Sequence, residues 1–285
     1  MDTLLATYGY DSDDNSNTDE NNTTLKNTVL EGGDEIKLSV VRLPPPPLDL
    51  LDSFHSIGGS SAQVNRIRSF PHVEGNYALH IFIPVLIPLS ARKPLGLFLK
   101  NIAPLVPGLH VVDADIKLNE LCNDDQKLEK YVFSREFHIS LGRTVPILVH
   151  QIDSIVSMLR QKLQTQKLDW IELNDWEVFI NDDGTRSFLS LEVTGGGLFE
   201  ITKLIRSVDV VYRLHGLPEF YENAQPHISL LWAIGNIRNT LKQAVKKVEG
   251  KSCCSRKRCI FTTRFSRIEC KIGKTSYKIT KFPDT

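Results

Sequence analysis

The sequence contains few cysteines and no long apolar run, and each shortage argues against a class of protein. Its 285 residues include five cysteines, an odd number with four of them after residue 250, so we expect reduced thiols and no obligatory disulfide framework. No stretch approaches the roughly 20 apolar residues that cross a bilayer. The first residues, MDTLLATYGY, also lack the basic start and apolar core of a secretory signal. We therefore expect a soluble, intracellular protein.

The cysteines are also poorly placed for a metal centre. They are Cys122, Cys253, Cys254, Cys259 and Cys270. Three of them cluster between residues 253 and 259, but no histidine follows His227 to complete a zinc-ligand set. We expect neither a metal nor another cofactor.

Charges of opposite sign are equal in number, 34 of each, but they are unevenly distributed. Residues 1–60 contain eleven Asp and Glu against three Lys and Arg. Residues 11–35 are polar and almost free of aromatic side chains, so they cannot bury enough surface to offset the entropy lost on ordering. The run Pro44–Pro47 favours polyproline II, as a spacer rather than a ligand for an aromatic groove. We expect residues 1–68 to be a disordered acidic and proline-rich leader, and residues 69–285 to be a bilobal folded domain.

From about Ser69 onward, strand and helix patterns alternate. Dense β-branched and aromatic residues predict strands, and apolar residues at helical spacing predict helices. The turn residues Asn181 to Gly184 predict a hairpin between two of the strands. Helices are predicted at 90–104, 146–166, 198–214 and 236–248, and strands within 69–88 and 130–143 and at 176–180, 187–193, 226–234, 259–263 and 267–272.

Two halves of this part follow one plan. Each half has a strand, a helix, a loop, a strand carrying the letters HISL, and another helix. The two HISL copies lie 89 residues apart, too far for a solenoid repeat but suited to a duplicated lobe. We predict an α+β fold of two pseudo-symmetric lobes, each an antiparallel sheet with helices packed outside, facing each other across a central cleft.

The two HISL strands carry groups suited to acid–base chemistry. Side chains alternate along a strand, so His138 and Ser140 point to one side, as do His227 and Ser229, while the Ile and Leu between them point to the core. Histidine titrates near neutrality, so one ring can accept a proton from an attacking hydroxyl while the other donates one to the leaving oxygen. The serine hydroxyls suit the non-bridging oxygens of a phosphodiester. The pattern predicts a two-histidine phosphodiester site, with either histidine as the acid.

A plainer interpretation is a pair of core histidines whose hydrogen bonds are satisfied by neighbouring serines. His80 fits this interpretation, because it lies among apolar residues with no hydroxyl two positions later, and we expect it to be structural. His110, His150 and His215 show no partner pattern. Repetition of all four letters favours function for the HISL histidines.

The residues around the motifs resemble a known superfamily. REFHISLGR and QPHISLLW are similar to the paired H-x-[S/T] motifs of the two-histidine (2H) phosphoesterases. The longer segments NYALHIFIPV and LHGLPEFYENAQPHISLLWAIGN resemble the branch that processes the 3′ end of the spliceosomal U6 small nuclear RNA. This resemblance runs from about Ser69 to the C-terminus. It implies a metal-independent 3′-to-5′ RNA exonuclease in the nucleus that trims uridines and adenosines and leaves a 2′,3′-cyclic phosphate or a terminal phosphate.

The resemblance also implies roles for single residues. His138 and His227 match the catalytic pair, and Ser140 and Ser229 match the phosphate binders. Tyr221, six residues before His227, matches the aromatic residue that stacks on the terminal base, with a packing role as the alternative. Two other functions stay open: a 2H phosphoesterase acting on 2′,5′-oligoadenylates or cyclic nucleotide phosphates, and an RNA-binding module without catalysis.

A basic stretch near the C-terminus fits an RNA partner. Residues 236–281 contain 14 Lys and Arg against two Asp and Glu, interleaved with Phe261, Phe265 and Tyr277. A solvated basic face is an equally good interpretation for any single residue. A nuclear import signal is a further interpretation for Lys246, Lys247, Lys251, Arg256, Lys257 and Arg258. We expect the RNA 3′ end as the partner of a monomeric protein, with spliceosomal proteins as further candidates.

Overall fold

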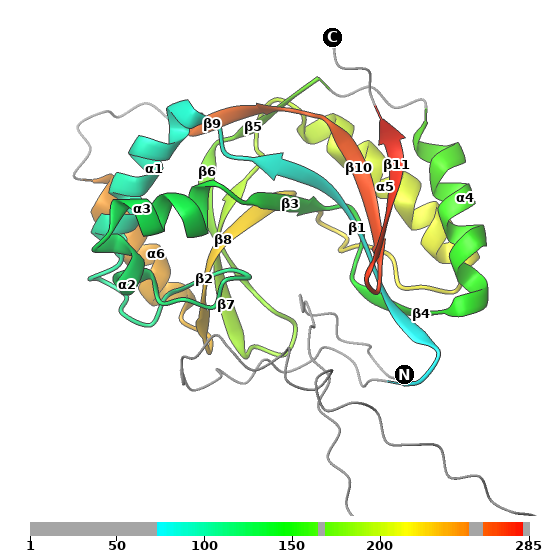
Figure 1. The fold of residues 1–285 in the computed structure, drawn as a ribbon, viewed down its shortest axis with the longest axis horizontal. Coiled ribbons are helices and arrows are strands. Elements are labelled where there is room, and N and C mark those ends of the chain that lie inside the picture. Colours follow the sequence, from blue (N-terminus) through cyan, green and yellow to red (C-terminus); the bar gives the residue numbers. More distant parts are fainter. Residues whose placement is uncertain (1–72, 165–168, 251–258, 282–285) are drawn as a thin grey trace, which may run out of the picture. The chain divides into compact units, whose positions relative to one another are not determined.

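The computed structural model describes residues 73–164, 169–250 and 259–281. The predicted leader and its boundary near residue 69, the thiols of Cys253 and Cys254, and the import-signal residues from Lys251 to Arg258 lie outside this part. Helices and antiparallel sheets make up the described residues (Figure 1), which confirms the predicted α+β class. No helix among them is long and apolar enough to cross a membrane.

The first sheet is built around β1 (Asn76–Leu86), whose residues from Leu79 to Val85 are all buried. Such a continuous buried run is typical of a strand covered on both faces. The strand order is β11–β10–β1–β3, all antiparallel, and β4 also pairs with β1. The bounds of these strands are β3 Glu136–Ser140, β4 Val145–Leu148, β10 Arg267–Ile272 and β11 Thr275–Lys281. Strands β3 and β4 pair with consecutive stretches of β1. All five residues of β3, which carries the first HISL motif, are paired with β1.

The helix predicted from Pro146 is wrong in its first residues. Pro146 lies in β4, opposite Ala78 of β1, and α4 spans Ile152–Leu163. Proline suits the first turn of a helix, but it is also tolerated in an edge strand, and pairing with β1 decides the outcome here. The strand predicted within 130–143 is also shorter than expected, because Glu129–Phe133 form a π-helical turn before β3.

The second sheet has the order β2–β8–β7–β6, again antiparallel. Its strands are β2 His110–Val111, β6 Asp175–Ile180, β7 Arg186–Glu192 and β8 His227–Ile234. The predicted hairpin is confirmed as β6 and β7, and β8 carries the second HISL motif. A register shift in the β7–β8 pairing places Ser190 directly opposite Ser229, and Glu192 opposite His227. Strands β5 (Trp170–Leu173) and β9 (Phe261–Arg264) form a separate antiparallel pair.

Four long helices of the described part pack against the two sheets. They are α1 (Leu89–Ile102), α4, α5 (Leu198–Leu214) and α6 (Arg238–Glu249), and the short α2 (Leu118–Cys122) and α3 (Asp125–Leu128) follow α1. Helix α4 contacts β11 and α5, whereas α6 contacts β6 and α1 (Figure 1). Phe98 of α1 also stacks on Trp176 of β6, with ring centroids 4.1 Å apart. Helices α4 and α5 thus accompany the first sheet, and α1 and α6 accompany the second. The predicted order of elements is repeated in the two halves of the sequence, but each sheet has one helix from each half, so a half of the sequence does not form one lobe.

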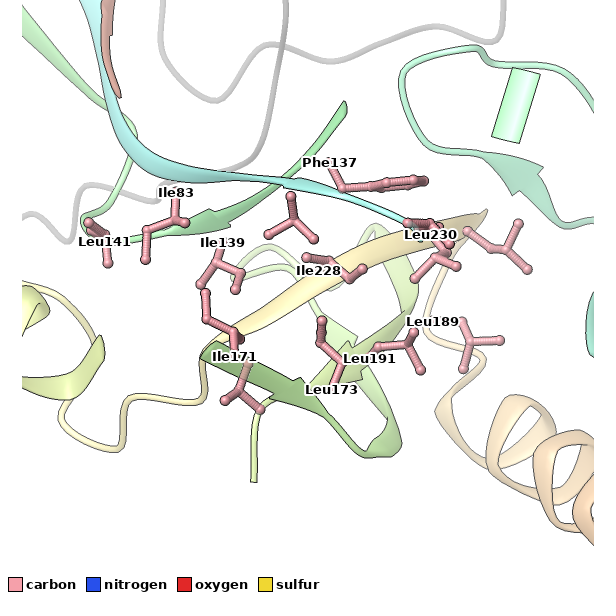
Figure 2. Packing of buried hydrophobic residues seen from close by; sticks show 14 of the residues in the cluster. Ile83, Phe137, Ile139, Leu141, Ile171, Leu173, Leu189, Leu191, Ile228 and Leu230 are labelled. Carbon is pink, nitrogen blue, oxygen red and sulfur yellow. The ribbon is translucent and has the colours of Figure 1, made fainter. Parts of the chain in front are cut away.

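The isoleucine and leucine residues of the two HISL motifs lie in one packed layer. Strand β3 contacts β8, and the side chains of Ile139, Leu141, Ile228 and Leu230 are completely buried. Figure 2 shows Ile139 and Ile228 in the same cluster as residues of β5 and β7. Because side chains alternate along a strand, the histidines and serines of both motifs face away from this layer. The packing of these apolar side chains therefore fixes β3 and β8 relative to each other.

Gly142, directly after the first motif, provides a test of this packing. A Cβ atom added there would lie 2.8 Å from the hydroxyl oxygen and 2.9 Å from Cζ of Tyr212, a fully buried ring whose hydroxyl donates to the Arg143 carbonyl. We expect Gly142→Ala to lower the free energy of unfolding by about 1–3 kcal/mol, the usual cost of overpacking. Urea unfolding measures this change. Gly108→Ala is the matched control, since its Cβ would meet nothing within 4 Å, and an equal loss in both variants would contradict the packing.

Candidate active site

The first motif lies on β3 beside two aromatic side chains of β1. The ring of His138 is half-buried and stands edge-on to the rings of His80 and Phe82, at centroid distances of 4.9 and 5.8 Å. His80 and Phe82 themselves stack at 4.8 Å, as residues two apart on one strand face can. Two rings of the neighbouring strand therefore limit the orientations open to His138.

Ser140 of the same motif is buried, and its hydroxyl oxygen lies 3.0 Å from Nε2 of His80. The expectation that His80 is structural stays a prediction, and its ring contacts both His138 and Ser140. Burial, together with the charges of His138 and Lys271, lowers the pKa of His80 well below its ordinary value. His80 is thus a neutral hydrogen-bonding group at this site.

The second motif lies at the start of β8. Nδ1 of His227 lies 2.7 Å from the Gln225 carbonyl oxygen, which can only accept, so Nδ1–H donates and Nε2 of the neutral ring carries the lone pair. The ring also stacks on Phe179 of β6, with centroids 3.9 Å apart and planes inclined by 14°. The hydroxyl oxygens of Ser229 and the buried Ser190 are 3.0 Å apart. Phe179 and Ser190 were not expected at the site, because only the strand register reveals them.

Strands β3 and β8 contact each other, so the structure brings the two motifs together, and the charges around the two histidines affect their pKa values. Burial lowers the pKa of His227 from 6.5 to about 4, the Gln225 carbonyl opposes this shift, and the charge of His138 adds to it. Burial also lowers the pKa of His138, while the Asp113 carboxylate opposes that shift and Arg135 adds to it. Asp113 and Arg135 form an ion pair at 3.0 Å. Both histidines are therefore neutral near pH 7 when no anion is bound, and the carboxylate favours the protonated form of His138 alone.

This burial should make stability depend on pH. The unfolded chain protonates His227 as the pH falls below 6.5, but the folded protein does so only near pH 4. Protons therefore favour the unfolded state in this window, and we expect up to about 3 kcal/mol of unfolding free energy to be lost between pH 6.5 and 4. Urea unfolding across these pH values measures the loss. His227→Asn, which cannot titrate, should show a smaller decline, caused in part by His138 and His80; equal declines would contradict the burial.

Tyr221 lies in a cluster with residues from two other segments. The Arg143 guanidinium lies over its ring, 4.0 Å from the centroid, and its hydroxyl donates to the Asp182 carboxylate at 3.2 Å. Arg143 and Asp182 also form an ion pair at 3.8 Å. Because Arg143 follows Ser140 by three residues, this cluster connects Tyr221 to the end of the first motif. Tyr221 as a whole residue is 39% exposed.

The basic stretch of residues 236–281 is divided among several roles. Lys242 pairs with Glu177, and Arg267 pairs with Glu136 and Glu269, so these side chains neutralise carboxylates of the protein. Lys271 of β10 is different, because its charge acts on His80. The described Lys246 and Lys247 are exposed.

The aromatic residues of this stretch belong mainly to the core. Phe261 and Phe265 are 5% exposed, and Tyr277 packs partly against the core cluster. Phe261 and Phe265 are therefore core residues and are not exposed for stacking on RNA bases. Tyr212 is also fully buried.

The described residues provide no obvious set of metal ligands. Among them, no group of three or more His, Cys, Asp or Glu side chains is placed to hold a metal ion. Their three cysteines, Cys122, Cys259 and Cys270, are free thiols. The groups available at the two motifs are imidazoles and hydroxyls.

Comparisons with known proteins found a match over residues 44–280 to the family described as HVSL, an uncharacterised conserved protein. U6 snRNA phosphodiesterase 1 of Dictyostelium discoideum is 30% identical over 206 residues, which cover 70% of this chain and 68% of that protein. The Mus musculus protein of the same name is 29% identical over 197 residues, 67% of this chain and 65% of that protein, so the match spans about two thirds of each relative. Among solved structures, Kluyveromyces marxianus Usb1 is similar with a TM-score of 0.49 and 11% identity, covering 71% of this chain and 97% of that one.

Proposed function

The chain belongs to the HVSL family, and we propose that it is a metal-independent 3′-to-5′ RNA exonuclease that trims uridines and adenosines from the 3′ end of U6 small nuclear RNA. The observation that carries the proposal is the contact between β3, which carries His138, and β8, which carries His227, each histidine being followed two residues later by a serine. The matched relatives are named for a phosphodiesterase of this RNA, which supports the choice of substrate. The activity belongs to a monomeric protein in the nucleus, where spliceosomal proteins are its candidate neighbours.

The reaction is an internal transesterification. The 2′-hydroxyl oxygen of the penultimate nucleotide attacks the phosphorus of its own 3′ phosphate, and the bond from phosphorus to the 5′ oxygen of the last nucleoside breaks. The general base takes the hydroxyl proton, and the general acid gives a proton to the leaving 5′ oxygen. A nucleoside leaves, and the shortened RNA carries a 2′,3′-cyclic phosphate, which a later hydrolysis can open to a terminal phosphate.

We assign the base to His227 and the acid to His138. The Nδ1–H bond to the Gln225 carbonyl leaves Nε2 of neutral His227 as a proton acceptor. The Asp113 carboxylate favours the protonated form of His138, and an anionic phosphodiester beside the ring favours it further, because an opposite charge raises the pKa of an imidazole. Binding of the substrate thus favours protonation of His138, the acid, while His227, the base, stays neutral.

The remaining predicted residues bind the substrate. Ser140 and Ser229 donate hydrogen bonds to the non-bridging phosphate oxygens, where charge develops in the transition state. Tyr221 stacks on the terminal base, a contact that tolerates both uridine and adenosine because each base has a π-face. Lys271 adds positive charge beside the first motif.

An RNA labelled at its 5′ end and ending in uridines, incubated with the protein in EDTA, tests this proposal. Stepwise shortening from the 3′ end is expected, at the same rate with and without the chelator. An otherwise identical RNA with a 2′-deoxy penultimate nucleotide should stay intact, since it lacks the nucleophile. Trimming of the deoxy substrate, dependence on added metal, or a preference for 2′,5′-oligoadenylates would each contradict the proposal.

A further inference from the structure

Each motif serine has a hydrogen-bonding partner on the neighbouring strand of its sheet. Ser229 of β8 has Ser190 of β7, its direct register partner, at 3.0 Å between hydroxyl oxygens. Ser140 of β3 has His80 of β1, two residues from its register partner Phe82, at 3.0 Å. Ser140, Ser190 and His80 are all buried. In both motifs, the serine thus has a buried hydrogen-bonding partner on the neighbouring strand, which the HISL sequence alone does not predict.

A serine hydroxyl has a single hydrogen, so it can donate only one hydrogen bond at a time. If Ser140 gives this hydrogen to His80, it has none left for a phosphate oxygen. If Nε2 of His80 carries a proton instead, the imidazole donates to the serine oxygen and His80 does not take up the serine hydrogen. The tautomer of His80 therefore decides whether Ser140 can donate its hydrogen to the phosphate of the substrate.

We propose that His80 is a positioning residue, present as the Nε2–H tautomer, which donates to the Ser140 oxygen and directs the Ser140 hydrogen to a non-bridging phosphate oxygen. This inference rests on the proposed function of Ser140 as a phosphate binder. Ser190 has the corresponding role for Ser229. His80 acts through Ser140 and does not itself touch the substrate, and because it is buried and neutral it adds no charge to the site.

A double-mutant cycle tests whether His80 acts through Ser140. His80→Phe keeps a ring beside Phe82 and His138 but removes the donor, and we expect it to lower kcat for the uridine-ending RNA about tenfold, the equivalent of one hydrogen bond. Ser140→Ala should lower kcat at least as much. The double variant should be no slower than Ser140→Ala, because the donor has no role once the hydroxyl is gone. Multiplied losses in the double variant would overturn the proposal.

Two further measurements separate positioning from folding. His80→Gln can donate through its side-chain amide, and we expect it to recover most of the kcat lost in His80→Phe, while thermal unfolding reports whether each variant is folded. The ¹⁵N resonances of the wild-type ring show directly which nitrogen carries the proton, and a proton on Nδ1 would overturn the proposal even if His80→Phe failed to fold. If Ser140→Ala trims at the wild-type rate, the proposed role of Ser140 has failed; if only His80→Phe does so, the role of His80 has failed.

Discussion

Replacing His138 or His227 with alanine is expected to slow RNA trimming by about 10²–10⁴-fold, the usual contribution of one general acid or base. Each variant loses one of the two proton transfers, while the serines and Tyr221 still bind the RNA. The loss should therefore appear in kcat and only weakly in KM. Single-turnover rates with 5′-labelled RNA measure it, because they isolate the chemical step from product release.

His150→Ala is the matched control, because His150 is exposed on the turn Val149–Gln151 before α4. It should trim at the wild-type rate. The double variant lacking both His138 and His227 should be far less impaired than the product of the two single losses, since the residues act in one step. Wild-type rates in either single variant would contradict the acid–base assignment.

Local patterns predict most of the secondary structure. The helix predicted at 198–214 is α5 with the same bounds, and the strand predicted at 226–234 is β8 to within one residue. The errors occur where a distant partner decides the conformation. Pro146 fits the start of a helix, yet it is paired with β1, a strand some 70 residues earlier in the chain. The packing of α1 against the second sheet, and of α5 beside the first (Figure 1), is also a tertiary outcome, which no local pattern contains.

The residues of the site also differ in whether a local pattern predicts them. The HISL repetition indicates His138, His227 and their serines, because alternation within a strand is a local rule. His80, Ser190 and Phe179 approach the motifs from neighbouring strands, so their part depends on register. The alternation of β1 does place His80 and Phe82 on one face, but only its pairing with β3 brings that face to Ser140. Such partners are predictable once strand pairing is known.

Tyr221→Ala is expected to weaken binding of the RNA 3′ end by about 1–3 kcal/mol, roughly 5–150-fold, because one base loses its stacking surface. The Arg143 guanidinium over the ring and the bond from the hydroxyl to Asp182 hold the ring in place before RNA arrives, which reduces the entropy lost on binding. Tyr221→Phe keeps the ring and loses only the Asp182 contact, so its loss should be much smaller. The dissociation constant of an RNA with a 2′-deoxy penultimate nucleotide, which cannot be cleaved, provides the comparison and is measured by fluorescence anisotropy.

The substrate itself separates stacking from a structural role of Tyr221. An RNA whose last nucleotide is abasic offers no ring to stack on, so wild-type protein and Tyr221→Ala should bind it with similar affinity. Phe199→Ala is the matched control for removing an exposed aromatic side chain, since Phe199 of α5 is 75% exposed, and it should change neither affinity. A deficit of Tyr221→Ala that persists on the abasic RNA would mean that the ring maintains the Arg143–Asp182 cluster, and the stacking role would then be wrong. A deficit confined to RNA with a terminal base would instead assign Tyr221 to recognition of that base.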